Sequence, residues 1–267
     1  MAKITAANRS LFNEKMKPYQ EQIDKIFQDE KATLAAMKQE KSPDAYKKIF
    51  LSEEMIHATT LYLAINNLSV EILQTKNTDA LNEGRKTIYK AIIYLEEIVT
   101  GMTDAAFSEY QDDVAQISNM SVKDRYLLVR KLGLSIRLII DAYGENTKWK
   151  WSFVELEGRF ATVAKNLIDF KEISKIYFDP RNPDYDTAVY YLRLVKKLFG
   201  KSADEYRDRY ELSTRRIDDI RLAISYLIAL RRIQILLNET GEAEEIKKKA
   251  LVWKSKMEAD QKKGLSK

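Results

Sequence analysis

The stretch TKWKWSFVELEGRFATVAKN, residues 147–166, holds two of the three tryptophans of the 267-residue chain, Trp149 and Trp151. Side chains two residues apart share one face of a strand but lie on different sides of a helix. From Trp149 onward, large apolar residues recur at steps of four and three, which is the spacing of one helix face. This first face consists of Trp149, Phe153, Leu156, Phe160, Val163, Leu167 and Phe170. The pattern predicts a single helix from Thr147 to about Ile176, with Trp149 in the core.

Trp151 lies off the first face and begins a second one. The second face continues through Val154, Gly158, Ala161 and Ile168, and Lys165 interrupts it. Two interpretations remain open at this point. Either the helix is a central one with neighbours on both sides, or the second face is an exposed seat for another protein, because a tryptophan beside small residues is a typical interface anchor.

Tyrosine is abundant, with fifteen residues, and the adjacent Tyr190 and Tyr191 cannot share one helix face. Tyrosine combines a broad apolar surface with a polar tip, which suits surfaces that are soluble first and buried on assembly. We therefore predict a partner-binding set from the second face and this pair. Its members are Trp151, Val154, Gly158, Ala161, Tyr190 and Tyr191.

The composition favours an all-α fold. Eight glycines and four prolines are few for this length, whereas all-β architectures need many tight turns. Helix-starting and helix-ending residues predict about eight or nine helices in an elongated bundle or a solenoid-like stack. The expected helices cover residues 18–40, 42–73, 78–101, 103–117, 121–144, 147–176, 183–200 and 202–238, the last with an optional break near Ser213 and Thr214, followed by a charged helix after Gly241.

Three segments are expected along the chain. Residues 1–41 form an N-terminal helical arm, residues 42–238 form the main helical body, and residues 239–267 form a charged C-terminal helix and tail. The first segment ends before the Ser42-Pro43-Asp44 helix start, and the last begins where lysine and glutamate dominate.

The residues of catalysis and metal binding are scarce. The chain has no cysteine and one histidine, His57, in a Glu54-x-x-His57 spacing that di-iron bundles need twice. Asn182, Asp184 and Asp186 alternate as in a calcium loop, but the glycine and the final glutamate of such a loop are missing. We therefore predict no catalytic, cofactor-binding or metal-binding residues, no cofactor, and a protein that is not an enzyme.

Charge gives no strong sign of nucleic-acid binding. Residues 201–267 hold sixteen Lys and Arg against twelve Asp and Glu, in alternation rather than in one-signed patches. A phosphate-binding surface is usually of one sign, so solvated helix faces and interhelical ion pairs are favoured.

No membrane insertion is expected either, because the apolar stretch 222–237 contains Arg231 and Arg232 and is too short for a bilayer. The start MAKITAANRS has no apolar run, so we expect no signal peptide in this chain.

Two stretches resemble the spirochaete flagellar coiling proteins: TKWKWSFVELEGRFATVAKNLIDF (residues 147–170) and FDPRNPDYDTAVYYLRLVKKLFG (residues 178–200). The helical, Lys- and Tyr-rich texture of residues 40–240 is also similar to that of this family. The resemblance implies a non-enzymatic sheath protein of the periplasmic flagellar filament. Such a protein contacts the flagellin core and other sheath subunits and contributes to filament curvature and motility. The resemblance implies a periplasmic location for a mature chain whose leader has been removed. Without the resemblance, we expect the protein in the cytoplasm. The alternative function is a soluble helical adaptor for a peptide partner or nucleic acid.

The first prediction concerns His57. Replacing His57 with alanine should leave the metal content and the assembly of the protein unchanged, because one Glu54-x-x-His57 motif cannot complete a metal site. The measurement is elemental analysis of the purified wild-type protein and the variant. Stoichiometric iron or zinc that disappears with the substitution would contradict the prediction.

Overall fold

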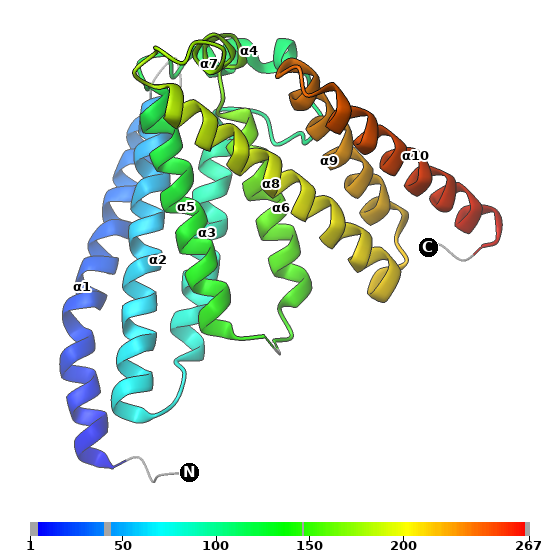
Figure 1. The fold of residues 1–267 in the computed structure, drawn as a ribbon. Helices are drawn as coiled ribbons and strands as arrows, with labels where there is room; N and C mark the ends of the chain where they lie inside the picture. Colours follow the sequence, from blue (N-terminus) through cyan, green and yellow to red (C-terminus); the bar gives the residue numbers. More distant parts are fainter. Residues whose placement is uncertain (1–4, 40–43, 146, 265–267) are drawn as a thin grey trace. The chain divides into compact units, whose positions relative to one another are not determined.

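The computed structural model describes residues 5–39, 44–145 and 147–264 (Figure 1). Over these ranges the chain forms ten α-helices and one short π-helix, and none of the described residues lies in a strand. The all-α prediction is confirmed, with ten helices where eight or nine were expected. Within the same ranges, no helix is long and apolar enough to cross a membrane.

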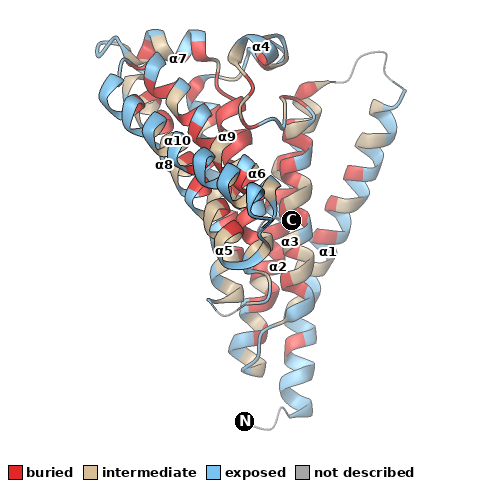
Figure 2. Ribbon diagram, turned by 90° about the vertical axis from the view of Figure 1, so that its right-hand side faces the viewer, coloured by how far each residue is buried: buried red, intermediate tan, exposed pale blue. Residues whose placement is uncertain are grey.

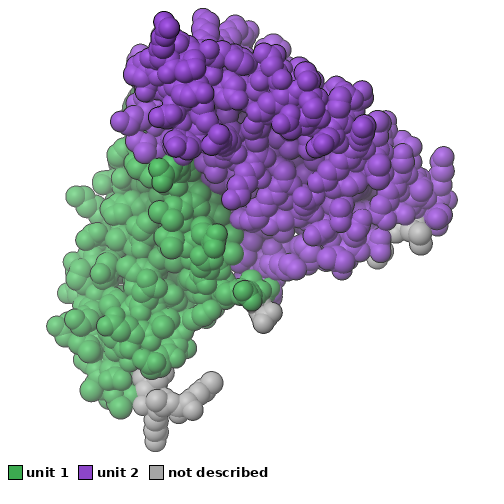
Figure 3. Space-filling model, in the orientation of Figure 1, with its two compact units in different colours: residues 1–98, 128–147 green, residues 99–127, 148–267 purple. Residues whose placement is uncertain are grey.

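The chain divides into two compact units (Figure 3). Unit 1 comprises Met1–Ile98 and Leu128–Thr147, and unit 2 comprises Val99–Leu127 and Lys148–Lys267. Both units are therefore built from segments that are separated in the sequence. The expected division into an N-terminal arm (1–41), a main helical body (42–238) and a charged C-terminal helix and tail (239–267) stays a prediction.

Unit 1 contains α1 (Ala6–Met37), α2 (Ala45–Leu73), α3 (Thr78–Glu96) and most of α5 (Val122–Tyr143). Three of these helices begin at a capping side chain, which accepts a hydrogen bond from a backbone N–H of the first turn. The caps are Thr5, Asp44 and Asn77. The helix expected from Pro18 thus begins twelve residues earlier, at Ala6, because Thr5 caps it, and Pro18 lies inside it. The predicted start at Ser42-Pro43 lies outside the described residues.

The core of unit 1 lies between α2, α3 and α5, whereas most of α1 is exposed (Figure 2). Gly84 of α3 allows a close approach of the helices, because a Cβ there would lie 2.9 Å from Ile139 of α5 and 3.3 Å from Tyr62 of α2. The exposed helix α1 is tied to α3 by Glu30, which pairs with Lys90 at 2.6 Å and accepts a hydrogen bond from the Tyr94 hydroxyl. A glycine contact and a buried carboxylate therefore set the helix positions in this unit.

Unit 2 contains α4 (Phe107–Ala115), α6 (Lys150–Asn166), α7 (Phe170–Tyr177), α8 (Tyr185–Arg209), α9 (Ile217–Leu236) and α10 (Thr240–Lys262). The π-helix Tyr210–Thr214 extends α8, and Arg215 then adopts a left-handed conformation before α9 begins. The break expected near Ser213 and Thr214 is confirmed. The end expected at Gly200 is wrong, because α8 continues through this glycine to Arg209.

The helix expected over residues 147–176 is in fact two helices, α6 and α7. Asp169 separates them, because its side chain accepts hydrogen bonds from the backbone N–H groups of Lys171 and Glu172 and so caps a new helix. The first face is confirmed from Phe153 onward, since Phe153, Leu156, Phe160, Val163, Leu167 and Phe170 are all buried. Trp149 is the exception, because it precedes the first turn of α6 and is half-buried.

Residues 100–105 also depart from the expected pattern. A helix was predicted to end at Gly101 in a left-handed conformation and the next to begin at Thr103, but α3 ends at Glu96, α4 begins at Phe107, and Gly101 has no positive φ. Side chains of α6 hold the carbonyls of this segment. Asn166 donates hydrogen bonds to the carbonyls of Thr100 and Met102, and Lys165 donates to those of Thr103 and Ala105. These hydrogen bonds fix residues 100–105 against α6 and give their carbonyls acceptor partners outside a helix.

Candidate functional site

The six residues of the predicted partner-binding set differ widely in exposure. Val154, Gly158, Ala161 and Tyr191 are buried within unit 2, whereas Trp151 is half-buried and Tyr190 is 55% exposed. Four of the six are thus covered by the chain itself. Binding of a partner at Trp151 or Tyr190 stays a prediction.

Gly158 explains why the second face of α6 is covered. A Cβ at this position would lie 2.7 Å from Cε2 of Tyr206 and 2.7 Å from the hydroxyl oxygen of Tyr226. These two rings, from α8 and α9, stack with centroids 5.7 Å apart and are almost completely buried. The small residues of the second face therefore pack against tyrosines of the same chain. The interpretation of Val154, Gly158 and Ala161 as an exposed binding surface is corrected to that of a central helix with neighbours on both sides.

The two accessible members of the set do not lie together. Tyr191 donates a hydrogen bond to the Ala164 carbonyl, and Lys201 pairs with Glu157, so α8 runs antiparallel to α6. Tyr190 therefore lies beside the C-terminal end of α6, while Trp151 lies at its N-terminal end, roughly 20 Å away at 1.5 Å per residue. The set does not form one continuous surface.

Another apolar surface lies on α5, in unit 1. Leu134 and Leu138 are 60% and 43% exposed, and their spacing of four places them side by side on one helix face. We call them the leucine pair. Two cations beside the pair are matched by acids, since Lys131 pairs with Glu53 at 2.8 Å and Arg137 pairs with Asp141 at 3.0 Å. An apolar pair among neutralised charges fits a protein surface better than a phosphate backbone.

Lys165 is a buried cation of unit 2, with 3% of its surface exposed. Its Nζ donates hydrogen bonds to the carbonyls of Thr103 and Ala105 at 3.1 and 3.0 Å and lies 5.2 Å from the centroid of the Tyr110 ring. Burial, followed by the nearby Arg232, lowers the pKa of Lys165 to about 8, although Asp104 and Glu109 act in the opposite direction. The sequence marks Lys165 as unusual, because it interrupts the apolar second face. The sequence does not reveal which groups Lys165 contacts.

Metal ligands do not gather in the described part of the chain, where no group of three or more His, Cys, Asp or Glu side chains could hold an ion. His57 lies on an exposed position of α2.

Glu205 of α8 is another titratable group with a shifted pKa. It lies beside Glu157 and Lys201, and its pKa is raised to about 7 by burial and by Glu157.

Comparison with known proteins identifies a family over almost the whole chain. The model of the TP0443 family matches residues 8–261. Its name is of a Treponema type, which is consistent with a spirochaete protein. No curated protein matches the chain, and no solved structure does.

The contact at Gly158 gives a prediction about stability. Gly158→Ala should lower the free energy of unfolding by about 1–3 kcal/mol, because the added methyl group overpacks against two buried rings. Gly200 is the matched control, since it lies inside α8 and an added Cβ would meet no atom within 4 Å. Gly200→Ala should instead raise the free energy of unfolding by about 0.5–1 kcal/mol. Urea denaturation measures both changes, and equal stabilisation by both would contradict the close packing of α6.

The lowered pKa of Lys165 gives a prediction about pH. Between pH 8 and 9.5 the unfolded chain keeps this lysine protonated while the folded chain loses the proton, so the unfolded state binds more protons and stability rises with pH. Relative to Lys165→Met, the wild type should gain on the order of 2 kcal/mol across this window. Urea denaturation at several pH values measures the gain. The exposed Lys171 is the control, and if Lys165→Met keeps the same pH dependence as Lys171→Met, the buried lysine is not the cause.

Proposed function

Since the chain belongs to the TP0443 family, we propose that it is a structural assembly protein of a spirochaete, a sheath component of the periplasmic flagellar filament. In this role it contributes to filament curvature and motility through protein–protein contacts rather than through catalysis. The proposal is supported by the family, whose name is of a Treponema type, and by the resemblance of residues 147–170 and 178–200 to the flagellar coiling proteins.

The leucine pair on α5 is the observation that carries the assembly role. Leu134 and Leu138 are exposed although the opposite face of α5, with Leu132, Ile136 and Ile139, is buried in unit 1. An exposed leucine by itself is ordinary, but two on one face beside matched ion pairs form the kind of apolar centre and polar rim seen in protein interfaces. We therefore assign the contact with a neighbouring subunit to this face of α5.

The partners in this proposal are the flagellin core and other sheath proteins. The location that goes with it is the periplasmic flagellum, reached by a mature chain after removal of a leader. Neither nucleic acid nor a lipid bilayer is needed by the proposed role.

Substitution of the leucine pair tests the proposal. The double variant Leu134→Glu, Leu138→Glu should fold as the wild type does, because both side chains are exposed, but it should bind flagellar filaments more weakly by about 2 kcal/mol or more. Cosedimentation with filaments purified from the source spirochaete measures the binding. The same charge change at Leu251 and Val252 of α10, which are 55% and 66% exposed, is the control.

A photo-crosslinking residue at position 134 identifies the neighbour. The proposal expects crosslinks to flagellin or to another sheath protein and loss of these crosslinks in mutants without filaments. A wild-type protein that does not cosediment with filaments, or that crosslinks to nucleic acid or to an unrelated peptide partner, would contradict the proposal and favour an adaptor.

A further inference from the structure

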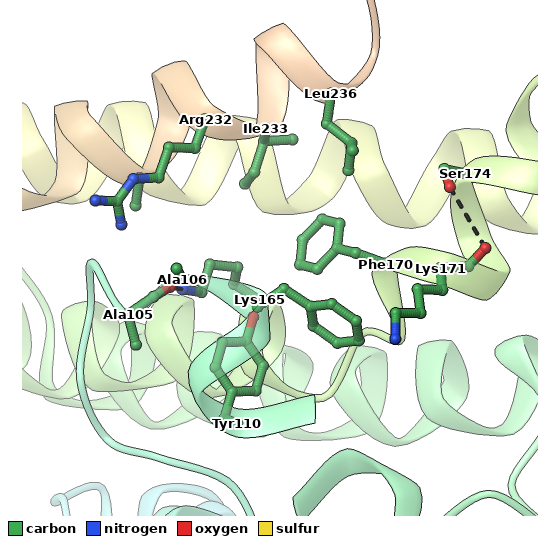
Figure 4. Close-up of a pocket in the computed structure, with 12 residues that line it drawn as sticks. Ala105, Ala106, Tyr110, Lys165, Phe170, Lys171, Ser174, Arg232, Ile233 and Leu236 are labelled. Atoms are coloured by element: carbon green, nitrogen blue, oxygen red, sulfur yellow. Dashed lines mark hydrogen bonds between the residues drawn. The ribbon is translucent and has the colours of Figure 1, made fainter. Parts of the chain in front are cut away.

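Unit 2 contains a pocket of about 300 Å³ between α4, the end of α6, α7 and α9 (Figure 4). Its walls are mainly aromatic and aliphatic. Phe107 and Tyr110 come from α4, Phe170 from α7, and Ile233 and Leu236 from α9. The volume lies at the lower end of the range found for small-molecule sites, and apolar walls with few polar groups are typical of them.

The charged residues of the pocket are all cations. Lys165, Lys171 and Arg232 line it, and no Asp or Glu is among its lining residues. Each cation is held by a neutral acceptor. Lys171 donates to the Gln111 side chain at 2.8 Å, and Arg232 donates to the Asp104 carbonyl. Within the described residues, none of the three makes a salt bridge. The lining itself therefore carries only positive charge, which favours an anion, while Asp104 and Glu109 lie near Lys165 outside the lining.

Lys165 has one donor to spare. An ammonium group has three N–H bonds, and over the described part of the chain Nζ of Lys165 uses two of them, on the carbonyls of Thr103 and Ala105. Figure 4 shows the head groups of Lys165 and Arg232 at the same end of the pocket, with Phe170 and Leu236 farther along. An anionic group at this end would meet two cations, and an apolar body would extend over the aromatic walls.

We propose that this pocket binds a small free monocarboxylate with an apolar body, whose carboxylate accepts hydrogen bonds from Lys165 and Arg232. A carboxylate offers several acceptor positions and an apolar chain matches the remaining walls, whereas a phosphate-rich ligand would leave these walls unused. The pocket lies in unit 2 and shares no residue with the leucine pair, so the inference does not rest on the proposed assembly role.

Octanoate is the probe for this site. Isothermal titration calorimetry of the full chain at pH 6.5, where Lys165 is mostly protonated, should show octanoate binding at one site per chain. Octanamide and octylamine, which carry the same chain without the negative charge, should bind at least about tenfold more weakly, because a hydrogen bond to a charged group is lost. Equal affinity for octanoate and octanamide, or no binding of octanoate, would overturn the proposal.

Three variants locate the binding. Lys165→Met should weaken octanoate binding by at least about tenfold and leave octanamide binding unchanged. Arg232→Met gives the same test at an exposed residue, so it remains informative if Lys165→Met fails to fold. Lys175→Met, on α7 but outside the lining, is the matched control. Unchanged octanoate affinity in Arg232→Met and in any folded Lys165→Met protein would overturn the assignment. Tighter binding of an acetylated dipeptide with a free carboxylate would overturn the choice of a small molecule and indicate the chain end of a partner.

Discussion

The attachment of residues 100–105 to α6 is the interaction on which unit 2 depends. Thr162 contacts the Thr103 hydroxyl at 3.1 Å, and Lys165 and Asn166 hold four backbone carbonyls of the same segment. These contacts give partners to the four carbonyls, to Nζ of Lys165 and to Nδ2 of Asn166, which burial without hydrogen bonds would penalise. They hold the segment in a non-helical conformation before α4, which begins at Phe107, and Ala105 at the end of the segment lines the cationic pocket. On the opposite part of α6, Gly158 admits the tyrosines of α8 and α9.

Helical periodicity was enough to predict the fold class and most of the buried face of α6. It worked from Phe153 to Phe170 because apolar residues at steps of four and three bury in the same way whatever helix covers them. It did not decide what covers Gly158, since a groove of small residues accepts a ring from the same chain as readily as one from a partner. It also missed the interruption at Asp169, where one capping side chain outweighs a continuous apolar pattern.

The candidate sites were harder to predict for a physical reason. Lys165 becomes unusual only when the carbonyls of Thr103 and Ala105, about sixty residues earlier in the chain, surround its ammonium group. Leu134 becomes conspicuous only when the three-dimensional fold buries its neighbours on α5 and leaves it outside. Both facts depend on contacts between distant segments, which residue spacing does not contain. Together they separate the buried faces of α6 in unit 2 from the exposed face of α5 in unit 1, to which we assign assembly.

Hydroxyl-radical footprinting of the isolated protein and of native filaments tests this separation most directly, because it reports the solvent access of individual side chains. We expect Leu134 and Leu138 to react in the isolated protein and to become protected in filaments, whereas Phe160 and Tyr191 should stay unreactive in both. Leucines that remain equally reactive in filaments, or a reactive Phe160 or Tyr191 in the isolated protein, would contradict this separation.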